Sequence, residues 1–234
     1  MDFANRTVMV TGAAGNLGRA VATAFAARGA ALVLVDRSEE TLRKAFGGDD
    51  ARHMLAAADL LDAAQVAQVV QRAVARFGRI DVLANLAGGF RMGEAVHETS
   101  DATWNFLMDL NARTLLNTVR AVVPQMLGAG GGRIVNVGAA AAQKGVARMG
   151  AYVAAKSAVI RLTEAMAAEL RENNINVNCV LPTIIDTPEN RAAMPDADPG
   201  RWVAPEALAD VIVFLASDAA RAIHGAAVPV SGLS

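Results

Sequence analysis

The chain has 234 residues, of which 53% are hydrophobic and 19% charged, and 22 Lys and Arg nearly balance 23 Asp and Glu. This length suits one large domain, and the near-neutral charge argues against a basic nucleic-acid-binding surface or an acidic disordered tail. One cysteine, Cys179, excludes an intrachain disulfide, and three scattered histidines predict no metal site.

Short apolar runs alternate with longer helical patterns along the whole chain. Five runs predict strands that are covered on both faces, namely Thr7–Val10, Leu32–Val35, Val82–Ala84, Ile134–Val137 and Val177–Leu181. The runs between them predict helices at Leu17–Arg28, Ala63–Arg76, Thr103–Met126, Tyr152–Glu172 and Pro205–Ala216, and Ser38 caps a further short helix. We therefore expect residues 1–234 to form one α/β domain, a doubly wound Rossmann-type parallel sheet of about seven strands with helices on both faces.

Two other segments bear on location and function. The first ten residues hold only a short apolar run, Val8–Val10, and no stretch approaches the roughly 18 apolar residues of a membrane helix. We expect a cytoplasmic protein that binds neither membrane nor nucleic acid. Residues 183–204 are polar and contain three prolines, which predicts a flexible loop that covers a substrate.

A glycine-rich turn, Thr11–Gly18 (TGAAGNLG), directly follows the first strand and opens the first helix. Glycines at this place let the backbone approach a pyrophosphate at the helix N-terminus. Asp36 ends the second strand, where a carboxylate accepts hydrogen bonds from ribose hydroxyls and repels a 2′-phosphate. Arg37 could instead pair with that phosphate, so the pattern favours NAD over NADP. A turn with purely structural glycines is the alternative.

The only tyrosine of the chain, Tyr152, precedes Lys156 by four residues, so both lie on one face of a predicted helix. A free phenol has a pKa of about 10, and acid–base work near neutral pH needs a shift of roughly 3 units. A cation one turn away favours the phenolate and supplies part of that shift. An isolated Tyr-x-x-x-Lys pair is more often a surface tyrosine over an aliphatic lysine stem.

Taken together and in order, these motifs resemble the short-chain dehydrogenase/reductase family, in its small single-domain branch. The resemblance runs essentially from end to end and also includes Asp59 in an Ala-Asp-Leu segment, the strand end Asn85–Gly88 and Asn111. The cofactor-binding residues that it implies are Gly12, Gly15, Asn16, Leu17, Gly18, Asp36, Arg37, Asp59, Leu60, Asn85, Ala87, Gly88, Tyr152, Lys156, Pro182, Ile185 and Thr187.

The resemblance implies hydride transfer between a nicotinamide and a carbonyl or alcohol carbon. Tyr152 would exchange the proton, Lys156 would bind the nicotinamide ribose and lower the pKa of Tyr152, and Asn111 would hold a water in the proton relay. Asn85 fits equally well as a strand-end hydrogen-bonding residue. The family also implies a homotetramer, or a homodimer, built on the helices Thr103–Met126 and Tyr152–Glu172.

The sequence departs from the family at three positions. The middle glycine of the loop is Asn16, a residue that tolerates left-handed backbone geometry. The position of the family's catalytic serine, 13 residues before Tyr152, is occupied by Ala139. Loss of one polarising hydrogen-bond donor typically lowers the rate by about 10²–10³-fold. Thr183 replaces the usual glycine after Pro182. Gln143 or Thr183 could supply a substitute donor, or both could be neutral wall residues.

These observations predict an NAD-preferring oxidoreductase of a small carbonyl, alcohol or activated C=N substrate that uses Tyr152 and Lys156 without the serine. The main alternative is a non-catalytic dinucleotide-binding sensor or scaffold of the same fold. A nucleotide-fold methyltransferase shares the first turn but has no use for the Tyr/Lys pair. We expect Phe90, Met92 and Met194 to line the substrate pocket, although each also fits an ordinary core.

Overall fold

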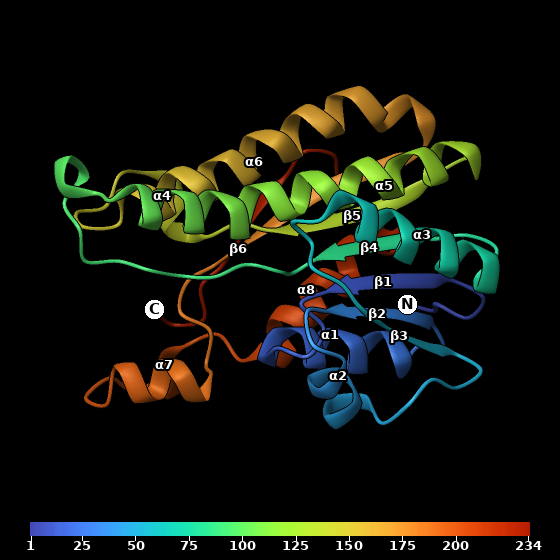
Figure 1. The fold of residues 1–234 in the computed structure, drawn as a ribbon, viewed down its shortest axis with the longest axis horizontal. Helices are drawn as coiled ribbons and strands as arrows, with labels where there is room; N and C mark the ends of the chain where they lie inside the picture. The colour runs from blue at the N-terminus through green and yellow to red at the C-terminus, as the bar shows by residue number, and fades with distance from the viewer.

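A seven-stranded parallel sheet runs through the middle of the computed structural model, which describes residues 1–234 (Figure 1). The strands are β1 (Thr7–Thr11), β2 (Ala31–Asp36), β3 (His53–Ala57), β4 (Val82–Asn85), β5 (Gly132–Val137), β6 (Ile175–Pro182) and β7 (Ala227–Val230), in the order β3-β2-β1-β4-β5-β6-β7. The strand order reverses between β1 and β4, which is the point where doubly wound sheets bind ligands beyond the carboxyl ends of their strands.

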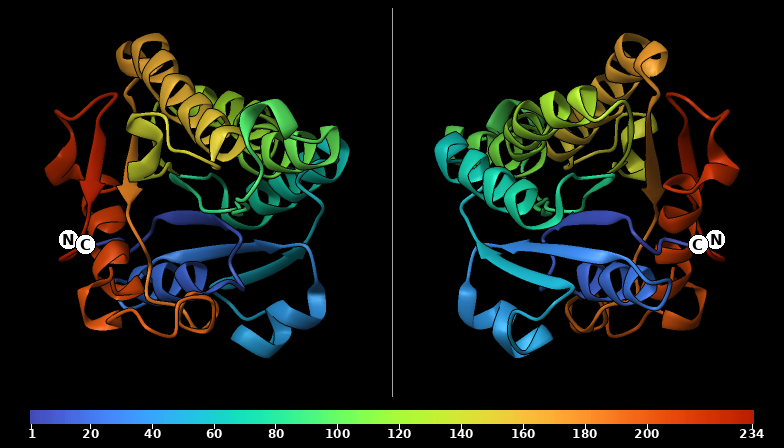
Figure 2. Two further views of the ribbon diagram at one scale, coloured as in Figure 1. Left: turned by 90° about the vertical axis from the view of Figure 1, so that its left-hand side faces the viewer. Right: turned by 90° about the vertical axis from the view of Figure 1, so that its right-hand side faces the viewer.

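Helices cover both faces of the sheet. They are α1 (Asn16–Ala26), α2 (Glu39–Phe46), α3 (Ala63–Phe77), α4 (Asp101–Met108), α5 (Thr114–Gly128), α6 (Gly150–Leu170), α7 (Pro188–Ala193) and α8 (Pro205–Leu215). Helices α3, α4, α5 and α6 form one layer, and α1, α2 and α8 form the other (Figures 1 and 2). A large apolar core fills the space between the sheet and each layer, which explains why the central strands are apolar on both faces.

The predicted doubly wound α/β fold is confirmed, and the differences concern its edges. Strands β3 and β7, which the sequence did not identify, each pair with a single neighbour. Strand β7 contains Pro229, which an edge strand tolerates because one of its sides makes no ladder hydrogen bonds. The predicted helix Thr103–Met126 is α4 and α5 joined by a π-helical turn, Asp109–Arg113.

Residues 183–204, hereafter the α7 segment, have more regular structure than predicted. Thr187 caps α7 because its Oγ1 accepts a hydrogen bond from the Asn190 backbone N–H at 3.2 Å. Ile185 and Val203 pair as an isolated parallel bridge, so the two ends of the segment lie side by side. None of the helices in the structure has both the length and the hydropathy needed to cross a membrane.

Candidate active site

A cleft of about 460 Å³ opens beyond the carboxyl ends of β1, β2 and β4. It is lined by many of the predicted cofactor-binding residues, namely Gly12, Gly15, Asn16, Leu17, Gly18, Asp36, Arg37, Asp59, Leu60, Ala87, Gly88, Ile185 and Thr187. Five further wall residues were not among those predicted, namely Ala58, Leu61, Leu86, Leu110 and Thr114. Four of these adjoin a predicted residue in the chain, and Thr114 lies three residues after Asn111, so helical spacing was the available signal.

The glycine-rich turn has the backbone that its sequence requires. Gly12 has a φ of 64°, and a Cβ there would lie 3.1 Å from Ala87 Cα, while a Cβ on Gly18 would overlap the carbonyl oxygen of Gly12. Gly15 precedes α1 and provides no side-chain cap. The first backbone N–H groups of α1 therefore remain available to an anion in the cleft.

The backbone of Asn16 does not adopt the left-handed conformation that asparagine tolerates. Asn16 is the first residue of α1, and the non-glycine residues with positive φ lie elsewhere in the chain. Its side chain instead donates a hydrogen bond from Nδ2 to Glu189 Oε2 at 2.8 Å and accepts one from Arg19 at 2.7 Å. The residue that replaces the family glycine thus connects the turn to the α7 segment.

Two carboxylates on the cleft wall are held in place by backbone N–H groups. Asp36 accepts hydrogen bonds from the backbone of Ala14 (2.9 Å) and of Arg37 (2.7 Å). Asp59 accepts one from the backbone of Leu61 at 2.9 Å. The side chain of Arg37 is exposed at the same wall.

The predicted catalytic residues come together beside Gly88. Lys156 is buried, and its Nζ donates a hydrogen bond to the Val137 carbonyl at 2.9 Å. A Cβ on Gly88 would lie 2.8 Å from Asn111 Oδ1 and 3.1 Å from Lys156 Nζ, so the backbone passes close to both side chains. Tyr152 lies one helical turn before Lys156 on α6. Gly88 also lines the cleft, and it therefore links the cleft to Asn111 and Lys156.

Asn111 is buried in the π-helical turn between α4 and α5. Its Oδ1 accepts a hydrogen bond from the Gly89 N–H at 3.1 Å, and its Nδ2 donates to the carbonyls of Gly89 (3.1 Å) and Leu107 (2.9 Å). π-Helical turns frequently occur at functional sites. The side chain of Asn111 fixes the loop that follows β4.

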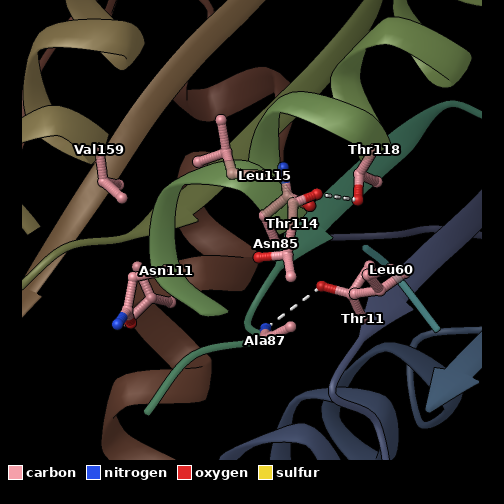
Figure 3. Close-up of a pocket in the computed structure, with 10 residues that line it drawn as sticks. Thr11, Leu60, Asn85, Ala87, Asn111, Thr114, Leu115, Thr118 and Val159 are labelled. Atoms are coloured by element: carbon pink, nitrogen blue, oxygen red, sulfur yellow. Dashed lines mark hydrogen bonds between the residues drawn. The ribbon is translucent and has the colours of Figure 1, made fainter. Parts of the chain in front are cut away.

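A small cavity of about 10 Å³ with a mixed polar and apolar lining lies next to Asn111 (Figure 3). Its lining residues are Thr11, Leu60, Asn85, Ala87, Asn111, Thr114, Leu115, Thr118, Val137 and Val159. A volume of this order corresponds to about one water molecule. Asn85 does not reach the main cleft, because its Nδ2 donates to Asn136 Oδ1 at 3.0 Å in the sheet. Pro182 also lies outside the cleft lining.

Burial shifts the pKa values of Tyr152 and Lys156 on α6. Burial raises the pKa of Tyr152 to about 12 and lowers the pKa of Lys156 to about 8. The expected lowering of the Tyr152 pKa by Lys156 is therefore not found. The physical reason is that the phenolate loses its hydration in an apolar environment, whereas the Lys156 ammonium hydrogen-bonds to Val137.

Ala139 provides no hydroxyl where the family has its serine. It packs in a small apolar cluster with Ala142, Ile160, Cys179 and Leu181, and Tyr152 lies against this cluster. The second suggested donor is engaged elsewhere, because the Thr183 hydroxyl is hydrogen-bonded to the Ser231 carbonyl at 2.9 Å and to the Ser234 hydroxyl at 2.7 Å. Gln143 is exposed.

Comparison with known proteins gives matches over most of the chain. The family model described as short chain dehydrogenase matches residues 6–198. D-Threitol dehydrogenase of Mycolicibacterium smegmatis is 36% identical, with 97% of this chain and 92% of that protein covered. Cis-4-hydroxycyclohexanecarboxylate dehydrogenase of Sinomonas cyclohexanicum is also 36% identical, with 98% and 96% covered. Carveol dehydrogenase from Mycobacterium avium in complex with NAD has a TM-score of 0.89 at 28% identity, with 98% and 97% covered.

Proposed function

Because this chain belongs to the short-chain dehydrogenase/reductase family of oxidoreductases, we propose that it transfers a hydride between NAD and a small carbonyl, alcohol or activated C=N substrate. The observation that carries the proposal is the position of Gly88. It lines the large cleft, and its backbone also lies close to the side chains of Asn111 and Lys156. The three dehydrogenases named above support it, since each is named for an alcohol and the carveol dehydrogenase was solved with NAD.

The cleft residues fit a nicotinamide dinucleotide. The uncapped N-terminus of α1 offers backbone N–H groups to a pyrophosphate, and Gly12 and Gly18 leave room for close approach. The carboxylate of Asp36 would accept hydrogen bonds from the adenosine ribose hydroxyls. The Asp36 carboxylate would repel the 2′-phosphate of NADP, so we propose NAD as the cofactor. Arg37 is the only positively charged residue on this wall of the cleft.

The protonation states of the two α6 residues suit carbonyl reduction. Burial keeps the pKa of Tyr152 near 12, so its phenol is protonated at neutral pH and can donate a proton to a substrate oxygen. Lys156, with a pKa near 8, still carries its charge there and would bind the hydroxyls of the nicotinamide ribose. The nicotinamide, when bound, supplies or accepts the hydride. Asn111 would position the water of the proton relay beside Lys156.

With alanine at position 139, Tyr152 is the only side-chain hydroxyl between Val119 and Lys156. An activated C=N bond needs less polarisation than a ketone, and Gln143 remains a candidate second donor on the rim. The absence of the serine motivates the second candidate function, a dinucleotide-binding sensor or scaffold that has lost turnover.

The deciding experiment measures NADH and NADPH oxidation over a panel of carbonyl and imine substrates, for the wild type and for Tyr152→Phe. We expect turnover with NADH and a loss of at least about 10²-fold in the variant. NADH affinity, measured by fluorescence, should change little. Equal rates in the two proteins would exclude Tyr152 as the proton donor. Saturable NADH binding without turnover on any substrate would instead support the sensor.

We also propose a homotetramer, with a homodimer as the smaller alternative. Trp104 and Phe106 of α4 are large apolar side chains that remain exposed on the single chain. Such side chains on one helix fit a self-association surface. Light scattering tests this directly, because a mass equal to that of one chain, 24.2 kDa, would contradict it.

A further inference from the structure

An exposed aromatic ring stands against the proposed catalytic phenol. The rings of Phe90 and Tyr152 meet edge-on, with centroids 4.9 Å apart and planes at 88°. Phe90 is nonetheless 55% exposed, and Met92, two residues along the same loop, is exposed to the same extent. The two side chains are therefore not core residues. They present an apolar surface next to the hydroxyl that would face the substrate.

The surroundings of Tyr152 within the fold are apolar as well. Tyr152 packs against two apolar clusters, one of Ala139, Ala142, Ile160, Cys179 and Leu181 and one of Leu107, Ala151 and Ala155. Ala139 belongs to the first cluster, so the change from serine to alanine extends an apolar surface in addition to removing a donor. The side chains packed directly against Tyr152 are thus hydrocarbon. The two arginines of the adjoining pocket are engaged within the chain, because Arg91 lies over the Phe106 ring and Arg148 donates a hydrogen bond to the Gly93 carbonyl at 3.0 Å.

Nearby side-chain hydroxyls and carboxylates are already used by the chain. Thr183 is hydrogen-bonded to residues of the C-terminal turn, and Ser157 Oγ donates to the Ala142 carbonyl at 3.0 Å. Glu94 accepts hydrogen bonds from Ser100 and Thr103. A substrate with several hydroxyl groups would give up its hydrogen bonds to water here and find few fixed partners in return.

We infer that this site takes carbonyls or secondary alcohols carried on a hydrocarbon ring, and discriminates against short polyhydroxylated ones. The inference deepens the proposed function and rests on it for the role of Tyr152. The ring of such a substrate covers Phe90 and Met92, and its oxygen reaches the Tyr152 hydroxyl. The free energy of binding then comes from apolar area removed from water, with one directional hydrogen bond for orientation.

The kinetic test compares cyclohexanone with dihydroxyacetone in NADH-dependent reduction by the wild type. We expect kcat/KM to favour cyclohexanone by at least about 10-fold, the discrimination typical of a few buried methylene groups. Phe90→Ala should lower kcat/KM for cyclohexanone about 10-fold, mainly through KM, and change the dihydroxyacetone value by less than about 2-fold. The matched control is Phe214→Ala, an exposed phenylalanine on α8, which should leave both values unchanged. Equal or better use of dihydroxyacetone would overturn the inference.

A binding measurement separates this inference from the proposed function. Because Tyr152 is the only tyrosine, ring-¹³C-tyrosine labelling gives one set of ring resonances that reports on the site alone. With NADH present, cyclohexanol cannot react and should shift these resonances saturably, while glycerol at equal concentration should not. A cyclohexanol shift without turnover of any ketone would support the ring site and contradict hydride transfer. Turnover of ketones with shifts by glycerol alone would contradict the ring site and leave the function standing.

Discussion

The side-chain amide of Asn16 donates a hydrogen bond to the carboxylate of Glu189 at 2.8 Å, although 173 positions separate the two residues in the chain. Asn16 begins α1 at the wall of the cofactor cleft, and Glu189 lies in the first turn of α7. Hydrogen bonds from the Glu189 backbone and the Thr187 side chain lower the pKa of the Glu189 carboxyl most, and the Asn16 amide and the charge of Arg19 lower it further. Arg19 also donates a hydrogen bond to Asn16. The hydrogen bond between Asn16 and Glu189 connects the α7 segment to the glycine-rich turn.

Removing this contact should loosen the α7 segment. For Asn16→Gly and for Glu189→Ala we expect amide hydrogen exchange across residues 183–204 to become about 2- to 5-fold faster in the cofactor-free protein. The effect is small because each change removes one exposed, charge-assisted hydrogen bond. NADH should dissociate faster by a similar factor. The double variant should match the single variants, because both remove the same bond. Glu206→Gln, which changes another carboxylate near α1, is the control. Additive effects of the two changes would show that the residues act separately.

Lys156→Met should inactivate the protein and stabilise it. Burial lowers the pKa of Lys156 from 10.5 to about 8, so the charged form costs about 3 kcal/mol at neutral pH. The methionine removes this cost but leaves the Val137 carbonyl without its hydrogen-bond donor. The unpaired carbonyl destabilises the folded state by about 1–3 kcal/mol, which offsets part of the gain. We expect a small net gain in the free energy of unfolding, visible as a rise in Tm. The control Lys144→Met changes an exposed lysine and should have no effect.

The pH dependence of stability distinguishes this explanation from a general packing effect. Between about pH 8 and 10.5 the native Lys156 has lost its proton while the unfolded chain still binds it, so Lys156 contributes a gain in the free energy of unfolding as pH rises. Lys156→Met should lack that gain, and its advantage should vanish near the upper limit. An advantage that stays constant with pH would contradict a cost caused by the buried charge.

The single tyrosine allows a direct titration of the proposed acid. Burial raises the pKa of Tyr152 from 10.0 to about 12, so tyrosinate absorbance of the folded, cofactor-free protein should develop only above the range of a free phenol. The unfolded chain ionises first, and the free energy of unfolding should therefore fall from about pH 10 to 12. A midpoint below that of a free phenol would show that Lys156 does lower the pKa of Tyr152, as the family resemblance implies.

Much of this fold could be predicted from the sequence, because central strands buried on both faces are apolar throughout and stand out from the helices between them. The edge strands β3 and β7 could not, since an edge strand pairs on one side and carries residues such as His53 and Pro229. The π-helical turn around Asn111 was also hidden. One extra residue per turn barely disturbs the apolar periodicity of a long helix.

The candidate site shows the same division between local and long-range information. The glycine-rich turn and Asp36 were predictable from local spacing, because the first strand, turn and helix form one continuous unit. The contact of Asn16 with Glu189 depends on how distant segments fold together. The direction of the Tyr152 pKa shift depends on burial, which the spacing of Tyr152 and Lys156 does not reveal.

Cofactor preference should depend on Asp36. Asp36→Asn keeps the side chain's size and an oxygen that can accept the Ala14 N–H, but removes the charge that would repel a 2′-phosphate. We expect the ratio of kcat/KM for NADPH over NADH to rise by about 10-fold, the effect of roughly 1.4 kcal/mol. Arg37→Ala in that background should reverse the gain, since Arg37 is the cation on the same wall. Asp59→Asn is the control. An unchanged ratio would indicate that the cleft binds the adenosine ribose elsewhere.

Ala139→Ser tests whether the missing donor limits the chemistry. Ala139 is buried beside Tyr152, so a hydroxyl added there lies next to the phenol. If polarisation of the substrate oxygen limits the rate, kcat for ketones should rise by about 10- to 10²-fold, because one such donor is worth up to about 10³-fold in well-adapted sites. Ala139→Val is the matched control, since it adds bulk without a donor and should lower kcat. A serine variant no faster than the wild type would have one of two explanations. Either another group already donates a hydrogen bond to the substrate oxygen, and Gln143 is the first residue to substitute, or the natural substrate is an activated C=N compound that needs no second donor.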